Sequence, residues 1–402
     1  MKVLQINSVC GYGSTGRIAV EICESLEHNG HDCLIAYGRG SASQSVNSSR
    51  IGSDLGVNIH GALSRLTDRH GFYSHGATRK FLKQAEAFNP DVIHLHNIHG
   101  YYINIKLLFE WLAKMNKPVV WTLHDCWAFT GHCSHFDYVK CEKWKTGCKR
   151  CPQKKEYPAS ICIDASKANY KSKQELFTSI EKMIIATPSE WLAGKVRESF
   201  LKSYPVFAIP NGIDLSVFRP TKNNFREKNG LTDKTILLGV ANKWDARKGI
   251  EDFIRLSEDL GPEYKVVLVG VDDKQSLPKN ILRIKRTQNL QELIGIYSAA
   301  DIYINTSVEE TMGMTTVEAL ACGTPVIVYN ATAVPETVDD TCGIIIEKGD
   351  YEGLKRAVRN FSDYTFSVAS CLHRAVLYSK EDMHWAYLKR YEELTYNSRK
   401  DK

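Results

Sequence analysis

The sequence has no apolar run of the length that a membrane-spanning helix needs, which is about 20 residues. It also lacks a charged start followed by an apolar core, because residues 1–6 already read as the beginning of a strand. Without such a core, the start does not look like a secretory signal. We therefore expect a cytoplasmic protein that is neither secreted nor threaded through a membrane.

Strong charge of one sign is missing as well. Lys and Arg number 52 against 46 Asp and Glu, so the formal net charge is only +6, and the basic residues are scattered. A dedicated nucleic-acid-binding protein usually concentrates its basic residues on one face, so we expect no nucleic-acid partner. The mild positive charge still allows peripheral contact with the inner face of an anionic membrane, or with an anionic lipid acceptor.

What the sequence does contain is enough chain for two or three domains. It has 402 residues, of which 43% are hydrophobic and 24% are charged, as in ordinary globular proteins. Apolar runs of strand length alternate with helical patterns in both halves. We expect helices at residues 18–26, 249–258 and 290–300, and strands at 3–7, 32–37, 91–96, 118–123, 182–187, 206–210, 236–240, 265–270, 281–284, 301–305, 326–328 and 343–346.

This alternation predicts an α/β fold with two Rossmann-like, doubly wound domains that face a cleft, each built on a parallel sheet. The turn signal at residues 210–214 is the best boundary. The tail from 381 to 395 is amphipathic, and we place Trp385, Leu388 and Tyr391 on its apolar face. The predicted parts are a first domain at 1–209 with a Cys-rich insertion at 131–156, a second domain at 210–380, and a terminal helix and tail at 381–402.

The segment 307–327 is the most informative part of the chain. Glu310 and Glu318 stand with seven residues between them, and Gly313 precedes a predicted helix that begins near Thr315. A helix N-terminus offers unpaired N–H groups and positive dipole to an anion. Glu318, about one turn into the helix, is placed to accept hydrogen bonds from paired sugar hydroxyls, and Glu310 to face the other end of the same ligand. A phosphate between two such carboxylates describes a nucleotide sugar.

This pattern resembles the Glu-x7-Glu signature of retaining family-4 glycosyltransferases with the GT-B fold, in particular those that build bacterial surface polysaccharide. The resemblance covers nearly the whole chain and is strongest at 289–327. It implies sugar transfer from a nucleotide-diphosphate sugar to an acceptor hydroxyl with retention, in polysaccharide or lipid-linked oligosaccharide synthesis. The acceptor would be a sugar or a lipid-linked oligosaccharide. In the resembled family the terminal helix crosses back to the first domain.

Within that resemblance, Glu318 would hold the donor ribose and Glu310 would position the donor sugar. The amides near Gly313, Met314 and Thr315 would bind the diphosphate. No Asp-x-Asp pair for a divalent ion occurs in the chain, which agrees with chemistry that needs no catalytic metal.

A basic loop at residues 243–249 follows the first strand of the second domain. Lys248 is predicted to neutralise the leaving diphosphate. The resembled family uses an Arg and a Lys five residues apart, and here Lys243 stands where the Arg is usual, which replaces bidentate geometry by a point charge. Arg247 is the substitute candidate. The alternative is a solvated basic loop.

The glycine-rich loop at residues 11–17 is a weaker signal. It reads equally as a tight strand-to-helix turn or as a ligand contact, and the resemblance favours contact of Gly13 and Ser14 with the donor phosphate or sugar. No acidic residue is placed for a ribose at the end of the second strand, so a nicotinamide cofactor is not expected. In the resembled family the loop matching 286–289 holds the nucleotide base, which makes Thr287 a candidate.

The segment at residues 121–131 places His124 directly after a buried strand, with Asp125 available to fix its tautomer. It resembles a His-Asp-x-Trp element found in some family-4 enzymes, where the histidine lies near the transferred sugar. His94, His96 and His99 form a second group, which we interpret as cleft lining and not as metal ligands.

Four of the twelve cysteines, Cys133, Cys141, Cys148 and Cys151, lie within nineteen residues. Their spacing favours a structural Zn²⁺ site, with free thiols or disulfides as the alternatives. The surrounding segment is read either as a solvated insertion or as a rigid basic flap that touches lipid diphosphate or membrane headgroups. The basic residues that surround it are Lys140, Lys143, Lys145, Lys149, Arg150, Lys154 and Lys155.

Two rival functions share the expected fold. A sugar-nucleotide 2-epimerase would need catalytic carboxylates in the first domain, which we cannot place. A non-catalytic sugar-nucleotide-binding subunit would bind the donor without turnover, and the presence of Glu310, Glu318 and Lys248 argues against it.

Overall fold

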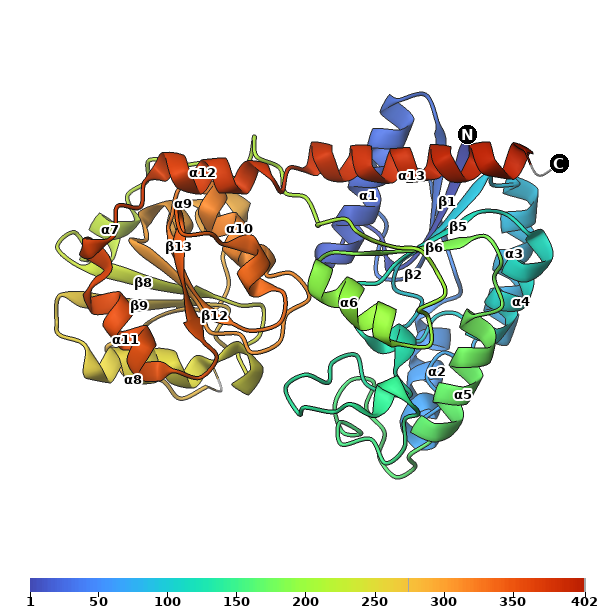
Figure 1. Cartoon of the computed structure of the whole chain (residues 1–402), viewed down its shortest axis with the longest axis horizontal. Helices are drawn as coiled ribbons and strands as arrows, with labels where there is room; N and C mark the ends of the chain where they lie inside the picture. The colour runs from blue at the N-terminus through green and yellow to red at the C-terminus, as the bar shows by residue number, and fades with distance from the viewer. Residues whose placement is uncertain (274, 401–402) are drawn as a thin grey trace. The chain divides into compact units, whose positions relative to one another are not determined.

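The computed structural model describes residues 1–273 and 275–400, and the chain forms two compact units. The first unit comprises Met1–Pro210 together with the chain from Met383 onward, and the second comprises Asn211–Asp382. Each unit is built on one parallel sheet with helices on both faces (Figure 1). The predicted fold class is confirmed.

The first sheet has seven parallel strands in the order β3-β2-β1-β4-β5-β6-β7. Its register sets Leu4 opposite Leu34 on one side and Ile93 on the other. The strands are β1 (Lys2–Val9), β2 (Asp32–Arg39), β3 (Ser48–Arg50), β4 (Val92–Leu95), β5 (Val119–Thr122), β6 (Met183–Thr187) and β7 (Val206–Ala208). Six of them were predicted. The short edge strand β3 was not, because its residues carry no apolar signal.

Alternate strand residues face opposite helix layers. On one face, α1 (Gly13–His28) packs with the terminal helix α13 (Lys380–Lys400) over Val3, Ile35 and Val120. On the other face, Leu4, Ile93 and Trp121 contact four helices: α3 (His75–Phe88), α4 (Ile105–Met115), α5 (Ser166–Phe177) and α6 (Glu190–Glu198). The remaining elements of this unit are α2 (Asp54–Thr67) and the short 3-10 turns η1 (Trp127–Phe129) and η2 (Lys143–Lys145).

Helix α13 begins in the second unit and continues over the first, as the resemblance implied. Its buried face consists of Met383, Tyr387, Leu388 and Tyr391, which belong to the core over β1 and β2. The prediction that Trp385 shares this face is wrong, since its side chain is 65% exposed. At about 100° per residue, position 385 lies on the opposite side of the helix from 383 and 387.

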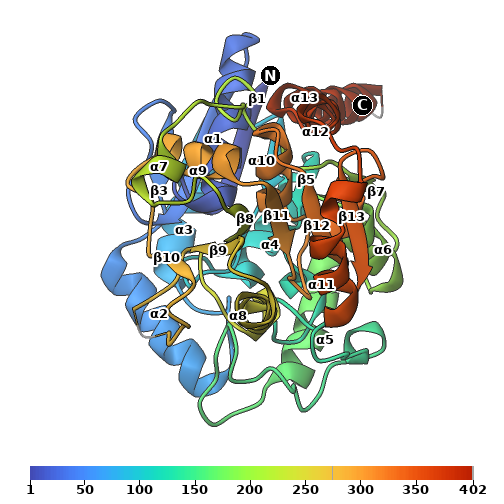
Figure 2. The ribbon, with the colours of Figure 1, turned by 90° about the vertical axis from the view of Figure 1, so that its left-hand side faces the viewer.

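The second sheet has six parallel strands in the order β10-β9-β8-β11-β12-β13, which Figure 2 shows from one edge to the other. Every strand was predicted. The strands are β8 (Thr235–Val240), β9 (Tyr264–Val269), β10 (Leu282–Ile284), β11 (Ile302–Asn305), β12 (Val326–Asn330) and β13 (Gly343–Glu347).

Helices cover both faces of this sheet too. One face carries α9 (Leu290–Ala299), α10 (Met314–Ala321) and α12 (Val368–Val376), and the other carries α8 (Ile250–Asp259) and α11 (Tyr351–Arg359). The smaller elements are α7 (Phe225–Lys228), η3 (Ala246–Lys248), η4 (Val334–Thr337) and η5 (Phe361–Asp363). Within the described part of the chain, no helix combines the length and the apolar character that crossing a membrane requires.

In both sheets the strand order reverses at one point, between β1 and β4 and between β8 and β11. Ligands of doubly wound sheets bind beyond the carboxyl ends of the strands at such points. The loops after β1, β5, β8 and β11 carry most of the predicted site residues, so the topology places the candidates of each unit where its ligand is expected.

Candidate active site

Lys248 and Glu310 form an ion pair in the second unit. Lys248 ends η3, just after β8, and Glu310 follows the neighbouring strand β11. The ammonium Nζ donates to Glu310 Oε1, and the two side chains are only 26% and 20% exposed. The carboxylate therefore balances the charge of Lys248, a pairing that the sequence did not suggest.

The loop that carries Lys248 is held by its own side chains and by a glycine. Asp245 accepts hydrogen bonds from the amides of Arg247 at 3.0 Å and Lys248 at 3.3 Å, and its carboxylate also lies 3.4 Å from the Arg247 guanidinium. Gly249 has φ +68°, and a Cβ there would lie 2.3 Å from Thr306 Oγ1. Only glycine lets this turn pack against Thr306.

The three basic candidates of this loop differ in their contacts and exposure. Lys248 contacts Glu310, Arg247 is paired with Asp245, and Lys243 is exposed. Of the three, Lys248 is the one that the structure brings beside a predicted donor-binding carboxylate.

Helix α10 begins at Met314, directly after Gly313, which has φ +91°. No side chain among the described residues caps this helix. Its first threonines are tied to β11, because Tyr303 donates from its hydroxyl to Thr315 Oγ1 at 2.7 Å and Asn305 donates to Thr316 Oγ1 at 3.0 Å. These bonds fix the direction of a helix N-terminus that favours an anion.

Glu318 lies in the second turn of α10, where Tyr297 from α9 donates to its Oε2 at 2.9 Å. Burial, and then the charge of Glu318, raise the pKa of Tyr297, so the phenol keeps its proton. The bond holds the carboxylate in one orientation. Thr287 lies in the loop between β10 and α9, outside this hydrogen-bonded set.

The glycine-rich loop of the first unit is closed on itself. Gly11 N donates to Gly16 O at 3.0 Å, and the buried Asn7 donates to the carbonyls of Val9 at 2.9 Å and Thr15 at 3.1 Å. Gly13 and the residue after it, Ser14, open α1 and are exposed. Asn7 is a positioning residue that sequence reasoning missed, since a polar residue inside a strand pattern gave no signal.

A hydrogen-bond chain determines the tautomer of His124. Gln5 donates through Nε2 to Ala19 O at 2.9 Å, so its Oε1 accepts from His96 Nε2 at 2.8 Å. Burial lowers the pKa of His96 well below its usual value, so its remaining nitrogen, Nδ1, is an acceptor. His124 Nε2 must then donate to it, at 3.2 Å. Burial lowers the pKa of His124 to about 4, which leaves a neutral ring whose Nδ1 carries the lone pair.

Asp125 is engaged elsewhere. Its Oδ2 lies 3.0 Å from His99 Nε2, and its Oδ1 accepts from the amide of Trp127 at 2.8 Å. A cavity of about 10 Å³ lies among His96, His99, His124 and Asp125. That is room for about one water molecule.

His94 does not line a cleft, and that prediction is wrong. Its ring is fully buried between the sheet and α13. Nε2 contacts Thr122 Oγ1 at 2.8 Å, and Nδ1 contacts the Tyr391 hydroxyl at 2.6 Å. His94 therefore anchors the terminal helix.

The four cysteines of the insertion are free thiols in the structure. Cys133 and Cys151 share a hydrogen bond, which lowers the pKa of Cys151 to about 7, and Cys148 lies near both Cys151 and Cys141. Among the described residues, no group of three or more His, Cys, Asp or Glu side chains is placed to hold a metal ion. Zinc binding by these thiols stays a prediction.

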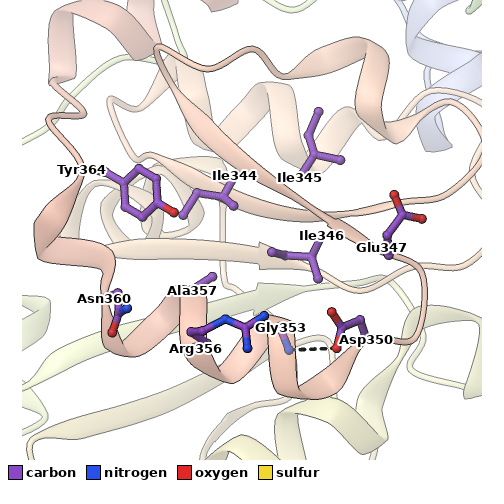
Figure 3. A pocket seen from close by; sticks show the side chains of 10 residues that line it. All are labelled: Ile344, Ile345, Ile346, Glu347, Asp350, Gly353, Arg356, Ala357, Asn360 and Tyr364. Atoms are coloured by element: carbon purple, nitrogen blue, oxygen red, sulfur yellow. Dashed lines mark hydrogen bonds between the residues drawn. The ribbon is translucent and has the colours of Figure 1, made fainter.

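A separate hollow of about 340 Å³ lies at the edge of the second sheet, between β13 and α11 (Figure 3). Ile344 and Ile346 line it from the strand, and Arg356 from the helix. Asp350, at the start of α11, accepts from the amide of Gly353 at 2.9 Å. None of the predicted site residues lines this hollow.

Two family models match most of the chain. The model for Glycosyltransferase Family 4 matches residues 15–217, about half of the chain, and the model for Glycosyl transferases group 1 matches residues 221–365. The gap between the two matches falls close to the division between the two units.

Relatives and solved structures agree with these matches. The chain is 25% identical over 364 residues to an Escherichia coli K12 protein assigned to colanic acid biosynthesis as glycosyl transferase WcaC, covering 85% of this chain and 86% of that one. It is 22% identical to a D-inositol 3-phosphate glycosyltransferase of Corynebacterium jeikeium, covering 73% and 72%. Similar folds occur in a sucrose-phosphate synthase from Thermosynechococcus elongatus (TM-score 0.70, 17% identity, 98% of each chain) and in Anabaena HepE crystallised with UDP-glucose (TM-score 0.66, 13% identity, 98% and 100%).

Proposed function

The chain belongs to glycosyltransferase family 4 and is a retaining glycosyltransferase that uses a nucleotide-sugar donor, and we propose that this donor binds in the second unit between the Lys248–Glu310 pair and helix α10. The observation that carries the proposal is that ion pair, because it joins the loops that follow β8 and β11, and the second loop leads into α10, which no side chain of the described residues caps.

In this proposal Glu318 binds the donor ribose. A carboxylate has about four acceptor sites on its two oxygens, so the hydrogen bond from Tyr297 leaves capacity for a pair of ribose hydroxyls. Because Tyr297 holds the carboxylate in one orientation, little conformational entropy is lost when the ribose binds. Thr287 is proposed to contact the base.

The leaving diphosphate is stabilised by Lys248 and by the amides of Met314 and Thr315. When the donor enters, the Lys248 ammonium group leaves Glu310 and pairs with the phosphate. The freed Glu310 carboxylate then accepts hydrogen bonds from the sugar hydroxyls. The fixed cation and the helix dipole stabilise the negative charge that develops on the leaving group, which is electrostatic catalysis. The leaving phosphate takes the acceptor proton. Lys243 and Arg247 add positive charge at the edge of this site.

The first unit supplies His124, Gly13 and Ser14. His124 is held against His96 with a neutral ring, and we propose that it lies near the transferred sugar. Gly13 and Ser14 are exposed where α1 begins, and we propose contact with the donor phosphate or sugar there.

The near full-length similarity to a colanic acid biosynthesis glycosyl transferase supports a role in polysaccharide synthesis, with a sugar or lipid-linked oligosaccharide as acceptor at the cytoplasmic face of the membrane. The UDP-glucose complex of a structural neighbour supports a nucleoside-diphosphate hexose as donor. In this proposal a zinc ion held by the insertion is structural, and sugar transfer uses no catalytic metal. Metal analysis of the purified protein decides whether Cys133, Cys141, Cys148 and Cys151 hold it, and the spacing predicts stoichiometric zinc.

A thermal-shift screen tests the donor site. The protein is heated with UDP, GDP, ADP, CMP and their common sugars, and the screen is repeated with Glu318→Ala and with the matched surface variant Glu352→Ala. We expect one nucleoside diphosphate to stabilise the wild type and Glu352→Ala but not Glu318→Ala. A shift that Glu318→Ala retains, or no shift with any nucleotide, would overturn the site assignment.

A further inference from the structure

Helix α2 turns its apolar side outward. Its buried residues are the polar His60 and Ser64. Surface helices of globular proteins normally do the reverse and bury their apolar stripe. The exposed large side chains, at i, i+4, i+8 and i+11, are Leu55 (70% exposed), Ile59 (52%), Leu63 (36%) and Leu66 (55%).

The inversion is fixed by hydrogen bonds. His60 Nδ1 contacts Ser74 Oγ at 2.8 Å, and His60 Nε2 accepts from the amide of Gly71 at 3.3 Å. Ser53 caps the start of the helix by accepting from Gly56 N at 3.3 Å. Rolling the helix to bury its leucines would break these bonds and expose a histidine that burial keeps neutral.

The segment that follows the Cys-rich insertion, residues 157–165, extends this stripe. Ile161 donates its amide to Arg65 O at 2.9 Å, and Asp68, at the end of α2, accepts from the amide of Ala165 at 2.7 Å. Ile161 and Ile163 are 65% and 50% exposed beside the last turn of the helix. Figures 1 and 2 both place α2 at the end of the first unit where the loops of the insertion lie. We call Leu55, Ile59, Leu63, Leu66, Ile161 and Ile163 the α2 surface.

The rim of the α2 surface is basic. Lys154 donates from Nζ to Cys162 O at 3.0 Å, which holds its ammonium group beside Ile161 and Ile163. Two of the nearby acids are already engaged, because Asp54 pairs with Arg50 and Asp164 accepts from Cys151 N and Ser166. Arg65, Lys155 and Lys167 are exposed on the same segments, as is the acidic Glu156.

We propose that the α2 surface docks the first unit on the interface of an anionic lipid bilayer. An amphipathic helix that lies in the interface plane buries its apolar face at the acyl boundary and sets basic side chains at the headgroups. A soluble monomer seldom leaves so continuous an apolar stripe exposed. The α2 surface would make the membrane contact that the proposed function includes. The inference rests on the proposed function only for the existence of that contact.

Co-sedimentation with vesicles tests it, without donor or acceptor. We expect the wild type to bind vesicles of phosphatidylcholine mixed with phosphatidylglycerol, to bind pure phosphatidylcholine weakly, and to lose binding as salt is raised. Ile59→Asn with Leu63→Asn should lower the partition coefficient at least about tenfold. Leu377→Asn, an equally exposed leucine of the second unit, should leave it unchanged.

Charge reversal is the second arm. Arg65→Glu with Lys155→Glu should also release the protein from anionic vesicles, whereas Lys279→Glu in the second unit should not. Leu66→Asn alone replaces the double variant if that variant unfolds below the temperature of the assay.

Three results would overturn the proposal. Undiminished vesicle binding by the Ile59 and Leu63 variant would place the membrane contact elsewhere. Equal binding to neutral and anionic vesicles would remove the role of the basic rim. A wild-type dimer that Ile59→Asn dissociates, with no vesicle binding, would make the α2 surface a contact between two copies of the chain. Each variant is also screened for its nucleotide thermal shift, so that failure of this proposal is distinguished from failure of the donor site.

Discussion

Lys248 and Glu310 form an ion pair, so without donor the charge of each side chain is balanced by the other. The ion pair joins residues that are 62 positions apart. A partly buried pair of this kind gains little net stability, but it keeps a cation in a defined place. In the proposed site the donor diphosphate competes with Glu310 for the ammonium group, so substitution of the two residues should have opposite effects on diphosphate binding.

Glu310→Gln should separate binding from turnover. Lys248 loses its competing anion, so a nucleoside diphosphate should bind more tightly by about 1 kcal/mol, or about fivefold. Sugar transfer should nevertheless fall about a hundredfold, because Glu310 no longer positions the donor sugar. Isothermal titration and initial rates measure the two effects. Weaker diphosphate binding by Glu310→Gln, with Glu352→Gln unchanged, would contradict the competition.

The chain from Gln5 through His96 to His124 acts at the same scale. Gln5→Leu removes the acceptor of His96 Nε2 and leaves a buried donor unsatisfied, at a cost of about 1–3 kcal/mol. His96 can then adopt the other tautomer, and His124 is no longer fixed. We expect kcat to fall about tenfold while KM for the donor stays nearly constant. Gln5→Glu keeps the acceptor for His96 but loses the donor to Ala19 O, so it should restore only part of kcat. An unchanged kcat in Gln5→Leu would remove His124 tautomer control from the mechanism.

The turn between β8 and α8 is the element that delivers Lys248, and Gly249 is its critical position. A Cβ at Gly249 would meet Thr306 Oγ1 at 2.3 Å and the Thr306 carbonyl oxygen at 2.6 Å. The glycine is required for close packing as well as for its positive φ.

Gly249→Ala should therefore destabilise the second unit by about 3 kcal/mol, which adds steric overlap to the usual strain of about 1 kcal/mol. Gly349→Ala is the control, because it has φ +84° and nothing within 4 Å, and it should lose only the strain. Thermal unfolding with a nucleoside diphosphate present compares the two. Equal losses of stability in both variants would show that contact with Thr306 is unimportant.

The strands with an apolar run were predicted, whereas helix α2 and the short edge strand were not. The buried strands are visible in the sequence as apolar runs, which is why β4, β5 and β12 fall where expected. Helix α2 was not predicted, although its apolar residues recur at helical spacing; that spacing does not reveal that the stripe faces outward while His60 and Ser64 are buried. The edge strand β3 has no apolar residue at all.

Among the candidate site residues, too, some could be proposed from the sequence and others could not. Residues that belong to a local motif, such as Gly313 and Glu318, could be proposed from the sequence. Tyr297, which holds Glu318, and Asn7, which holds the glycine-rich loop of the first unit, could not, since they carry no motif of their own. The orientation of His124 was attributed to Asp125, the adjacent residue, whereas in the structure His124 contacts His96 and Asp125 pairs with His99. Sequence proximity was a poor guide to contact in a parallel sheet.

Across the whole molecule, buried neutral histidines gather in the first unit. Burial lowers the pKa of each one, to about 3 for His60 and about 4 for His124. The others whose pKa burial depresses are His70, His94 and His96. In the unfolded chain these rings take up protons below about pH 6.5, so the unfolded state binds more protons than the folded state below that pH.

Stability should therefore fall as the pH drops from 6.5 toward 4, by up to about 1.4 kcal/mol per pH unit for each buried ring. Thermal unfolding between pH 7 and pH 5 measures this loss. His60→Gln should reduce the slope, because it removes one titrating group from a site that glutamine can fill with hydrogen bonds. A stability that stays flat from pH 7 to pH 5 would mean that these rings are not held neutral.

In the proposed donor site, Glu318 holds the nucleoside part of the donor and Lys248 holds its diphosphate. Titration calorimetry with a nucleoside monophosphate and the matching diphosphate, on Glu318→Ala and Lys248→Ala, is the sharpest test of this assignment. We expect Glu318→Ala to weaken both ligands alike, by about tenfold, and Lys248→Ala to weaken chiefly the diphosphate. If both variants bind both ligands as the wild type does, or if Lys248→Ala weakens the two equally, the donor does not bind in the way described.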